Sequence, residues 1–319
     1  GLLLLQNQDL QEAWQLYERR LQGPSQLFTR PATAAPLWTG KSLEGPLLLV
    51  HEQGLGDTFQ FIRFARTLQS HGHRLIFQGP SKLHALLLQS ALVDHCVADG
   101  EPPSSAIAAW TPLMSLPLRL NQLAPQGSSD LAAPYFQIAA KTRTDWQQRL
   151  GPKQGLRIAL HWQGNPDHEF ALSRGRSVPL TCLEPLANLE GIEWLALQKG
   201  PGSEQMEGSA FTTRWHPQQT LISSTWEFID TAAILQCCDL LISSDSGLAH
   251  LAGGLGVPVW LMLPALAEWR WGLQGSSSGW YPNHRLYRQP TEGDWTAVIR
   301  EIRRDLILQR DRAATTQQG

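Results

Sequence analysis

The sequence predicts an α/β protein built from two doubly wound, Rossmann-like domains that follow a short helical segment. Apolar stretches of strand length alternate with amphipathic stretches of helix length, which is typical of parallel sheets covered by helices. The chain has 319 residues, enough for two domains of about 150 residues each. A Gly-Pro-Lys-Gln-Gly stretch at 151–155 separates two such series. We therefore expect a helical, repeat-like segment with its linker at 1–45, a first domain at 46–150, a second domain at 151–290 and a C-terminal helix at 291–319.

The first series begins after an N-terminal helical stretch and a connector. Residues 2–21 show helical periodicity, and residues 22–46 are rich in Pro, Gly, Ser and Thr. Strands are then predicted at 47–52, 74–79, 95–99 and 106–110. Helices are predicted at 58–70 and 81–89. This alternation favours a parallel sheet.

The second series follows a polar helical stretch at 139–155. Strands are predicted at 156–162, 192–198, 239–244 and 257–263. Helices are predicted near 181–189, near 230–237, from 247 onward and at 294–310. We expect the last helix to pack back towards the N-terminal domain. In such open sheets ligands bind at the carboxyl ends of the strands, where the loops are polar.

Composition excludes several classes of protein. A net charge of −2 gives no basic surface for nucleic acid. No apolar run approaches the length of a membrane span, and the first residues lack the pattern of a signal peptide. The four cysteines have no C-x-x-C pair and no zinc spacing, and we expect the adjacent Cys237 and Cys238 to be buried free thiols. A reducing, cytoplasmic location follows.

A glycine-rich loop, Gln53-Gly54-Leu55-Gly56-Asp57, follows the first strand. Its glycines let the backbone approach a ligand closely. A nicotinamide-binding fingerprint is excluded because Phe59 replaces the third glycine and no acidic residue ends the second strand. Asp57 has two interpretations: a cap of the following helix, or a carboxylate that faces the ligand site.

Two loops of the second domain carry cations just after strand ends. The long loop after 156–162 contains Arg174 and Arg176, and Lys199 follows the next strand. Guanidinium and ammonium groups here suit a phosphate, although ordinary solvated surface charge stays an alternative. His161 and His168 lack a third residue with metal-ligand spacing.

The stretch Ile-Ser-Ser-Asp-Ser-Gly-Leu-Ala-His at 242–250 is the strongest signal. Asp245, Ser246 and Gly247 stand where a strand gives way to a helix, and His250 lies one helical turn further on. The N–H groups at a helix start attract an anion. Plain capping by Asp245 or Ser246, with a backbone-bonded His250, stays the alternative.

Four aromatic residues follow the last predicted strand of the second series: Trp269, Trp271, Trp280 and Tyr281. Aromatic planes beside polar residues suit stacking on a base or a sugar. Packing in a core is the alternative interpretation for at least half of them.

Taken together, these motifs resemble the glycosyltransferase family 9-like (heptosyltransferase-like) domain. The resemblance rests on EQGLGD, the W-x-G-N loop ending in RSVPL, LQKG, FIDTAAIL, DLLISSDSGLAHLAGGLGVPVW, EWRWG, and WYP followed by LYRQP. It covers about residues 40–310. That domain often follows tetratricopeptide repeats in bacterial proteins, and AWQLYERRL is similar to the last helix of such an array.

The resemblance implies a GT-B fold, with two Rossmann-like domains facing a central cleft. It also implies an inverting glycosyltransferase of the hexosyl- or heptosyltransferase type that needs no metal and no cofactor, with the nucleotide sugar as its substrate. Asp57 would be the general base, and Gln53, Gly54 and Gly56 would belong to the acceptor loop. The donor-binding residues would be Arg176, Lys199, Asp245, Ser246, Gly247 and His250.

The expected partners are a nucleotide-diphosphate sugar donor and a glycan, lipid-linked or protein acceptor. The N-terminal helical segment could also bind a protein partner. Two other functions stay open on the sequence: a non-catalytic module that binds a sugar nucleotide or glycan, and a GT-B nucleotide-sugar epimerase. The donor sugar and its base are not specified by the motifs.

Overall fold

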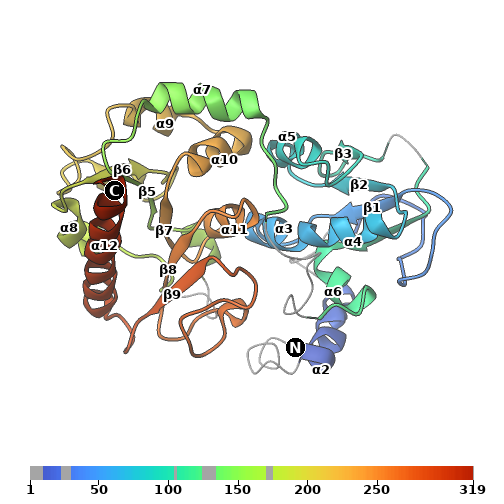
Figure 1. Cartoon of the computed structure of the whole chain (residues 1–319). Helices are drawn as coiled ribbons and strands as arrows, with labels where there is room; N and C mark the ends of the chain where they lie inside the picture. Colours follow the sequence, from blue (N-terminus) through green and yellow to red (C-terminus); the bar gives the residue numbers. More distant parts are fainter. Residues whose placement is uncertain (1–9, 23–29, 104–105, 124–133, 170–174, 319) are drawn as a thin grey trace. The chain divides into compact units, whose positions relative to one another are not determined.

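The computed structural model describes residues 10–22, 30–103, 106–123, 134–169 and 175–318, and it contains two compact units (Figure 1). Unit 1 comprises Gly1–Ile138 and Gly279–Pro282, and unit 2 comprises Ala139–Ser278 and Asn283–Gly319. Each unit has its own parallel sheet. The chain is therefore an α/β protein, as predicted.

The sheet of unit 1 has the strand order β3-β2-β1-β4, with every pair parallel. The strands are β1 Leu47–Val50, β2 Leu75–Gln78, β3 His95–Val97 and β4 Ala109–Pro112. Strand β1 is buried along its whole length, which explains its continuous apolar run. The order reverses between β1 and β4, and such a switch point is where doubly wound sheets bind ligands.

The helix predicted at 58–70 begins earlier and is divided. Gly54 is the N-cap, and the helix runs as α3 Leu55–Phe61, η2 Ile62–Phe64 and α4 Ala65–Ser70. The other helical segments of this unit are η3 Ser81–Leu83, α5 His84–Gln89, η4 Leu113–Ser115 and α6 Leu116–Arg119. The loop before α3 therefore contains only His51–Gly54, and Asp57 lies inside the first helical turn.

A fully buried arginine lies within the 3₁₀ turn η2. Arg63 donates to the carbonyl oxygens of Gln60 and Trp280, both at 2.9 Å. Its guanidinium carbon lies 5.0, 5.5 and 4.6 Å from the ring centres of Tyr135, Trp280 and Tyr281. These contacts explain why Gly279–Pro282, far along the chain, belongs to unit 1.

The N-terminal helical stretch is α2 Leu10–Tyr17 followed by η1 Glu18–Leu21. Residues 1–9 of the predicted helix lie outside the described residues. Helix α2 packs on α6, and the buried Trp14 ring contacts Phe61 edge-on at 5.8 Å. This segment is therefore part of the core of unit 1.

The sheet of unit 2 has the strand order β6-β5-β7-β8-β9 and is also parallel. The strands are β5 Leu156–His161, β6 Ile192–Ala196, β7 Leu240–Ser244, β8 Val259–Leu263 and β9 His284–Arg288. Strand β9 was not predicted from the sequence. The order reverses between β5 and β7, so the switch point of this unit lies at their carboxyl ends.

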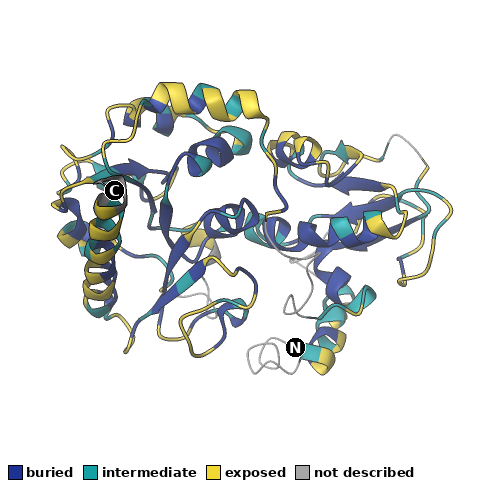
Figure 2. Cartoon of the chain, viewed as in Figure 1, coloured by how far each residue is buried: buried dark blue, intermediate teal, exposed yellow. Residues whose placement is uncertain are grey.

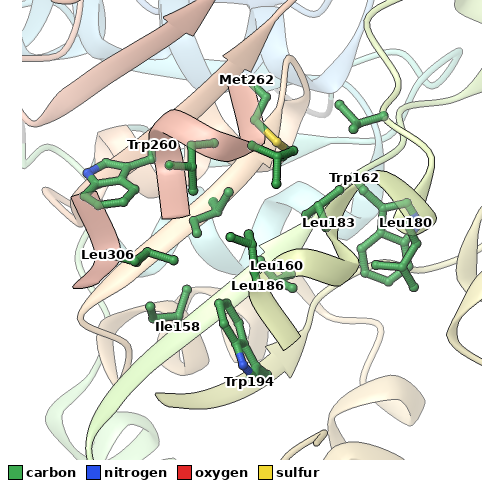
Figure 3. Packing of buried hydrophobic residues seen from close by; sticks show 14 of the residues in the cluster. Ile158, Leu160, Trp162, Leu180, Leu183, Leu186, Trp194, Trp260, Met262 and Leu306 are labelled. Atoms are coloured by element: carbon green, nitrogen blue, oxygen red, sulfur yellow. The ribbon is translucent and has the colours of Figure 1, made fainter. Parts of the chain in front are cut away.

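Helices cover both faces of this sheet (Figures 1 and 2). Helices α8 Leu180–Ala187 and α12 Trp295–Gln318 pack together on one face, and α7 Ala140–Leu150, α10 Phe228–Gln236 and α11 Gly247–Gly254 lie on the other. The remaining helical segments are η6 Pro166–His168, η7 Ser203–Met206, α9 Gln219–Ser224 and η8 Trp269–Trp271. Figure 3 shows side chains of β5, α8, β6, β8 and α12 in one apolar cluster.

Two boundaries differ from the expected divisions. Helix α7 belongs to unit 2 because it packs on α10, where Trp146 donates a 2.7 Å hydrogen bond to Asp230. The C-terminal helix was expected to pack towards the first domain. In the structure its apolar face, with Ile302 and Leu306, lies in the core of unit 2.

Candidate functional site

The predicted anion-binding turn lies between β7 and α11. Strand β7 ends at Ser244, Ser246 is the N-cap, and α11 begins at Gly247. The Ser246 hydroxyl lies 3.1 Å from that of Ser243, and Asp245 and Ser246 are each 8% exposed. The first N–H groups of an α-helix have no partner within the helix. The turn therefore offers donors at the switch point of the sheet.

His250, one turn into α11, is buried in an aromatic stack. Its ring lies 5.2 Å from that of Trp271 with an angle of 21° between the planes, and His284 stacks on Trp271 in turn at 6.0 Å. The Nε2 atom of His284 lies 3.2 Å from the carbonyl oxygen of Ala249. This stack packs against the start of α11 and holds it in place.

All four aromatic residues considered for stacking on a ligand are buried. Trp271 packs on His250, and Trp280 and Tyr281 surround Arg63. The Arg270 guanidinium lies over the ring of Trp269 at 4.6 Å. The structure thus favours core packing, the alternative interpretation.

Gln198 joins the loops that follow β5 and β6. Its side-chain oxygen accepts hydrogen bonds from the N–H groups of Trp162 and Gln163, at 3.1 and 3.0 Å. Its amide nitrogen donates to the carbonyl oxygens of Gln163 and Pro201, at 2.9 and 2.7 Å. Sequence reasoning missed this residue. Its place at a strand end, directly before Lys199, does not reveal its partners in the β5 loop.

Arg176 lies near the end of the loop that follows β5, and it packs against residues from the start of the same loop. Its guanidinium packs on Gly164, and its Nε atom lies 3.8 Å from the carboxylate of Glu169. Ser177, the next residue, accepts a hydrogen bond from the N–H of Gly164 at 3.1 Å and donates one to Glu169. Arg174 lies outside the described residues. The fixed guanidinium suits bidentate contact with a phosphate.

Several buried polar atoms beside the switch point have no hydrogen-bond partner among the described residues. These atoms are His161 Nδ1, Arg176 Nε, Lys199 Nζ and Ser244 Oγ. His161 and Ser244 end the adjacent strands β5 and β7, and Lys199 follows β6. Since buried polar groups are normally paired, such a concentration at one edge of a sheet indicates a place for a ligand.

Burial also lowers the pKa of two of these groups. It lowers the pKa of Lys199 to about 8. It lowers the pKa of His161 to about 4, and the nearby Arg176 guanidinium contributes to that shift. His161 is therefore neutral at neutral pH. The ammonium group of Lys199 lies 5.8 Å from the ring centre of Trp226, which is 66% exposed.

An acidic pair borders the same turn. Glu268 accepts hydrogen bonds from both the backbone and the guanidinium of Arg270. Burial raises the pKa of Glu268 to about 7; the Arg270 guanidinium opposes the rise, and the carboxylate of Asp245 adds to it. Carboxylates in this setting can accept hydrogen bonds from hydroxyl groups of a ligand.

The residues expected to form an acceptor loop lie in unit 1, after the carboxyl end of β1. Gly56 and Asp57 belong to the first turn of α3, and the Asp57 carboxylate accepts a 2.8 Å hydrogen bond from the N–H of Gly54. Asp57 is thus the third residue of the helix and Gly54 its N-cap. Gln53 has a φ of 60°, which is rare for a residue other than glycine.

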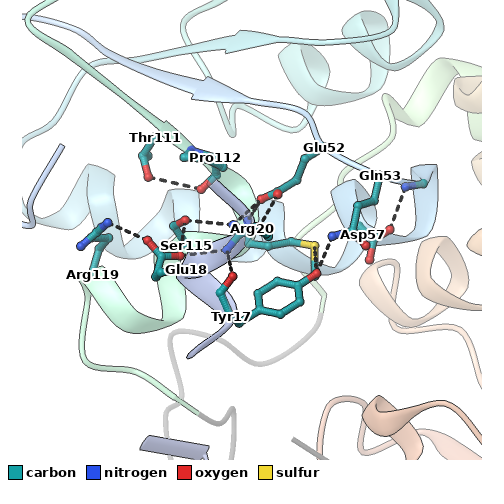
Figure 4. A network of polar contacts seen from close by, with 12 residues as sticks. Tyr17, Glu18, Arg20, Glu52, Gln53, Asp57, Thr111, Pro112, Ser115 and Arg119 are labelled. Atoms are coloured by element: carbon teal, nitrogen blue, oxygen red, sulfur yellow. Dashed lines mark hydrogen bonds and ion pairs between the residues drawn. The ribbon is translucent and has the colours of Figure 1, made fainter. Parts of the chain in front are cut away.

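A polar network connects this loop to the N-terminal segment (Figure 4). It includes Glu52, Arg20 and Tyr17, which sequence reasoning did not single out. Arg20 donates to both carboxylate oxygens of Glu52, at 2.8 and 2.9 Å. Only the tertiary fold brings these residues together, because 32 positions separate them in sequence.

Two kinds of feature are absent from the part of the chain that the structure describes. No helix there is both long and apolar enough to cross a membrane. Those residues also contain no group of three or more His, Cys, Asp or Glu side chains arranged to hold a metal ion.

Comparison of the sequence with known proteins finds a distant relative. No protein-family model matches the chain. Protein FlbA of Caulobacter vibrioides is 24% identical over 333 aligned residues, covering 91% of this chain but only 51% of FlbA. The chain therefore spans about half the length of this curated relative.

Two solved structures share the fold. ADP-heptose LPS heptosyltransferase II of Escherichia coli superposes with a TM-score of 0.57 at 14% identity, over 83% of this chain and 99% of that one. A family 9 glycosyltransferase from Veillonella parvula DSM 2008 gives 0.54 at 12% identity, over 76% and 86%. The chain has the fold of heptosyltransferase-like GT-B proteins, which confirms the predicted fold class and, at the level of fold, the family resemblance.

Proposed function

We propose that the chain is a glycosyltransferase that moves a sugar from a nucleoside-diphosphate sugar to an acceptor hydroxyl. The observation that carries this proposal is the group of unpaired buried atoms around the β5–β7 switch point, on His161, Arg176, Lys199 and Ser244. A diphosphate would pair with the two cations and with the N–H groups that begin α11. Gly247 at that helix start leaves room for the phosphates.

The same site also suits the sugar. Asp245 and Glu268 provide carboxylate oxygens beside the basic groups, and sugar hydroxyls are natural donors to them. We therefore assign the donor to unit 2, with Asp245, Ser246, Gly247, Arg176 and Lys199 as its contacts. His250 acts indirectly, because its stack with Trp271 holds the helix start in place.

The chemistry follows from where charge develops. The leaving diphosphate gains negative charge as the glycosidic bond breaks, and fixed cations with helix N–H groups stabilise it without a metal ion. Asp57 takes the proton of the acceptor hydroxyl as that oxygen attacks the anomeric carbon, which inverts the configuration. Gln53, Gly54 and Gly56 shape the acceptor loop around this carboxylate.

The choice of donor to test first comes from the structural relatives. One of them is an ADP-heptose heptosyltransferase, so ADP-sugars are our first candidates for this chain. A glycan, a lipid-linked sugar or a protein hydroxyl would serve as acceptor.

The test is a thermal-shift series with ADP, UDP, GDP and CMP and their sugars, in EDTA, followed by transfer assays with the stabilising donor. A ligand that binds only the native state raises the melting temperature. We expect one diphosphate to stabilise the protein without a divalent metal and its sugar to be transferred. Binding without transfer or hydrolysis would instead identify a non-catalytic module, and proton exchange into the sugar without acceptor would identify an epimerase.

A further inference from the structure

The loop that precedes α3 and Asp57 is joined to the N-terminal helical segment by a buried ion pair between Glu52 and Arg20. The side chain of Glu52 is fully buried, and that of Arg20 is 5% exposed. Besides its two bonds to Arg20, Glu52 accepts a 2.8 Å hydrogen bond from the backbone N–H of Met114. Glu52 thereby joins the end of β1, the start of η4 and the segment η1 at one point (Figure 4).

A second contact reaches the residue after Glu52. The side-chain amide of Gln53 donates to the hydroxyl of Tyr17, which in turn points at the sulfur of Met114, 3.7 Å away. The guanidinium of Arg20 lies 4.5 Å from the centre of the Tyr17 ring. Tyr17 therefore holds Gln53 in its unusual left-handed backbone conformation, which would otherwise cost free energy.

The anchoring of η1 does not depend on Tyr17. Glu18 accepts hydrogen bonds from Arg20, Ser115 and Arg119, at 2.9, 2.6 and 2.6 Å. These contacts hold the segment against η4 and α6. The Tyr17–Gln53 bond is additional, and its direct effect is on the loop rather than on the docking of the segment.

We infer that Tyr17 and Arg20 are positioning residues for Asp57, so that the N-terminal segment is a working part of the acceptor site. The inference rests on the proposed function. Gln53 precedes Gly54, and the N–H of Gly54 holds the Asp57 carboxylate at 2.8 Å. A shift of Gln53 moves Gly54 and, with it, the carboxylate. Small displacements of this kind cost up to about 100-fold in rate.

The test uses Tyr17→Phe, which keeps the ring, its packing and its contact with Arg20 but removes the hydroxyl. Tyr287→Phe is the matched control, because it removes a buried tyrosine hydroxyl that donates to Asp305 in unit 2. We expect Tyr17→Phe to lower kcat for transfer about ten-fold. KM for the donor and the affinity for nucleoside diphosphate should stay unchanged, since the donor site lies in unit 2.

A second measurement does not require activity. Hydrogen–deuterium exchange of the backbone at 52–57 should accelerate in Tyr17→Phe and equally in Gln53→Ala, but not in Tyr287→Phe. Combining Tyr17→Phe with Gln53→Ala should add nothing further. Unchanged exchange in Tyr17→Phe would overturn the inference, and so would unchanged kcat. If the wild type transfers no sugar but exchange at 52–57 still accelerates in Tyr17→Phe and Gln53→Ala as expected, the proposed function alone is overturned.

Discussion

The guanidinium of Arg176 lies directly against the backbone of Gly164. A methyl group added at Gly164 would stand 3.1 Å from both Nε and Nη2 of Arg176. These contacts are tight, so any side chain at Gly164 displaces the guanidinium. The absence of a side chain at Gly164 thus sets the place of the proposed phosphate-binding cation.

Gly164→Ala should therefore weaken the binding of nucleoside diphosphate by moving Arg176. Arg176→Ala removes charge-assisted hydrogen bonds and should cost about 1.5–3 kcal/mol. Gly164→Ala should cost part of that amount. Isothermal titration of the two single variants and the double variant checks the mechanism, because Gly164→Ala should add no loss once Arg176 is absent. Full additivity would contradict it. Arg214→Ala, in an exposed arginine of the same unit, is the control for charge alone.

Diphosphate binding should weaken as pH rises through about 8, the pKa that burial imposes on Lys199. Only the ammonium form attracts the phosphates, so above this pH binding requires uptake of a proton. The affinity should fall by at most about ten-fold per pH unit. Titrations between pH 7 and pH 9.5 measure this dependence. Lys199→Met should bind diphosphate weakly, and its affinity should not change with pH in this range. Lys141→Met, at a side chain 84% exposed, should behave as wild type.

The same shift has a consequence for stability. The folded pKa of Lys199, about 8, lies below the ordinary value of 10.5, so between these values the unfolded chain binds more protons. Lys199 therefore makes stability rise with pH across this window. Without ligand, Lys199→Met should be more stable than wild type below pH 8, and the difference should shrink towards pH 10.5. Urea unfolding at several pH values tests this, and a difference independent of pH would contradict it.

Asp57→Asn should separate catalysis from helix capping. The amide oxygen of Asn can still accept the hydrogen bond from Gly54, so the start of α3 should be kept. It cannot take a proton, so transfer should slow by about 10²–10⁴-fold while donor affinity stays normal. Single-turnover transfer beside nucleotide titration measures both. Asp94→Asn is the matched control, because Asp94 also accepts a backbone N–H, that of Leu75 at 2.7 Å. Wild-type rates in Asp57→Asn would end the assignment.

Glu193→Ala should destabilise unit 2 severely. Arg157, whose side chain is 2% exposed, donates to Glu193 at 2.7 Å. Removing the carboxylate leaves a buried charge without its partner, at a cost of about 3–5 kcal/mol. Denaturant unfolding followed by circular dichroism measures it, and Glu190→Ala, at an exposed position nearby, is the control. A loss below about 1 kcal/mol would be typical of an exposed pair and would contradict the prediction.

The strands buried on both faces were predictable because their burial requires continuous apolar runs, as in Leu47–Val50 and Val259–Leu263. Strand β9 was missed. It is the edge strand of its sheet, and its sequence His-Arg-Leu-Tyr-Arg has only two apolar residues, flanked by basic ones, so it lacks the apolar run of a buried strand. The start of α3 was misplaced because glycines at 54 and 56 usually break a helix, whereas here Gly54 caps it.

The candidate residues at strand ends could be found by the same reasoning. Lys199 and Asp245 directly follow predicted strands, so their placement needs only the parallel sheet. Arg176 lies near the end of the long loop after 156–162, and its charge just before a predicted helix was the signal. Gln198 and Glu52 could not be singled out, because their roles depend on partners in other loops. Local sequence carries no record of such partners.

Unit 1 is formed from two stretches that lie far apart in the sequence, which affects how the protein folds during synthesis. The buried Arg63 side chain donates a hydrogen bond to the carbonyl oxygen of Trp280, 217 residues later in the chain. Domains generally fold as units during synthesis, beginning from the N-terminus. Unit 1 cannot be completed until Gly279–Pro282 have been synthesised, and these residues follow most of unit 2 in the chain. Unit 2 also needs late residues, because β9 and α12 contribute Tyr287, Ile302 and Leu306 to its core. Neither unit can therefore complete its native packing until the last part of the chain has been synthesised.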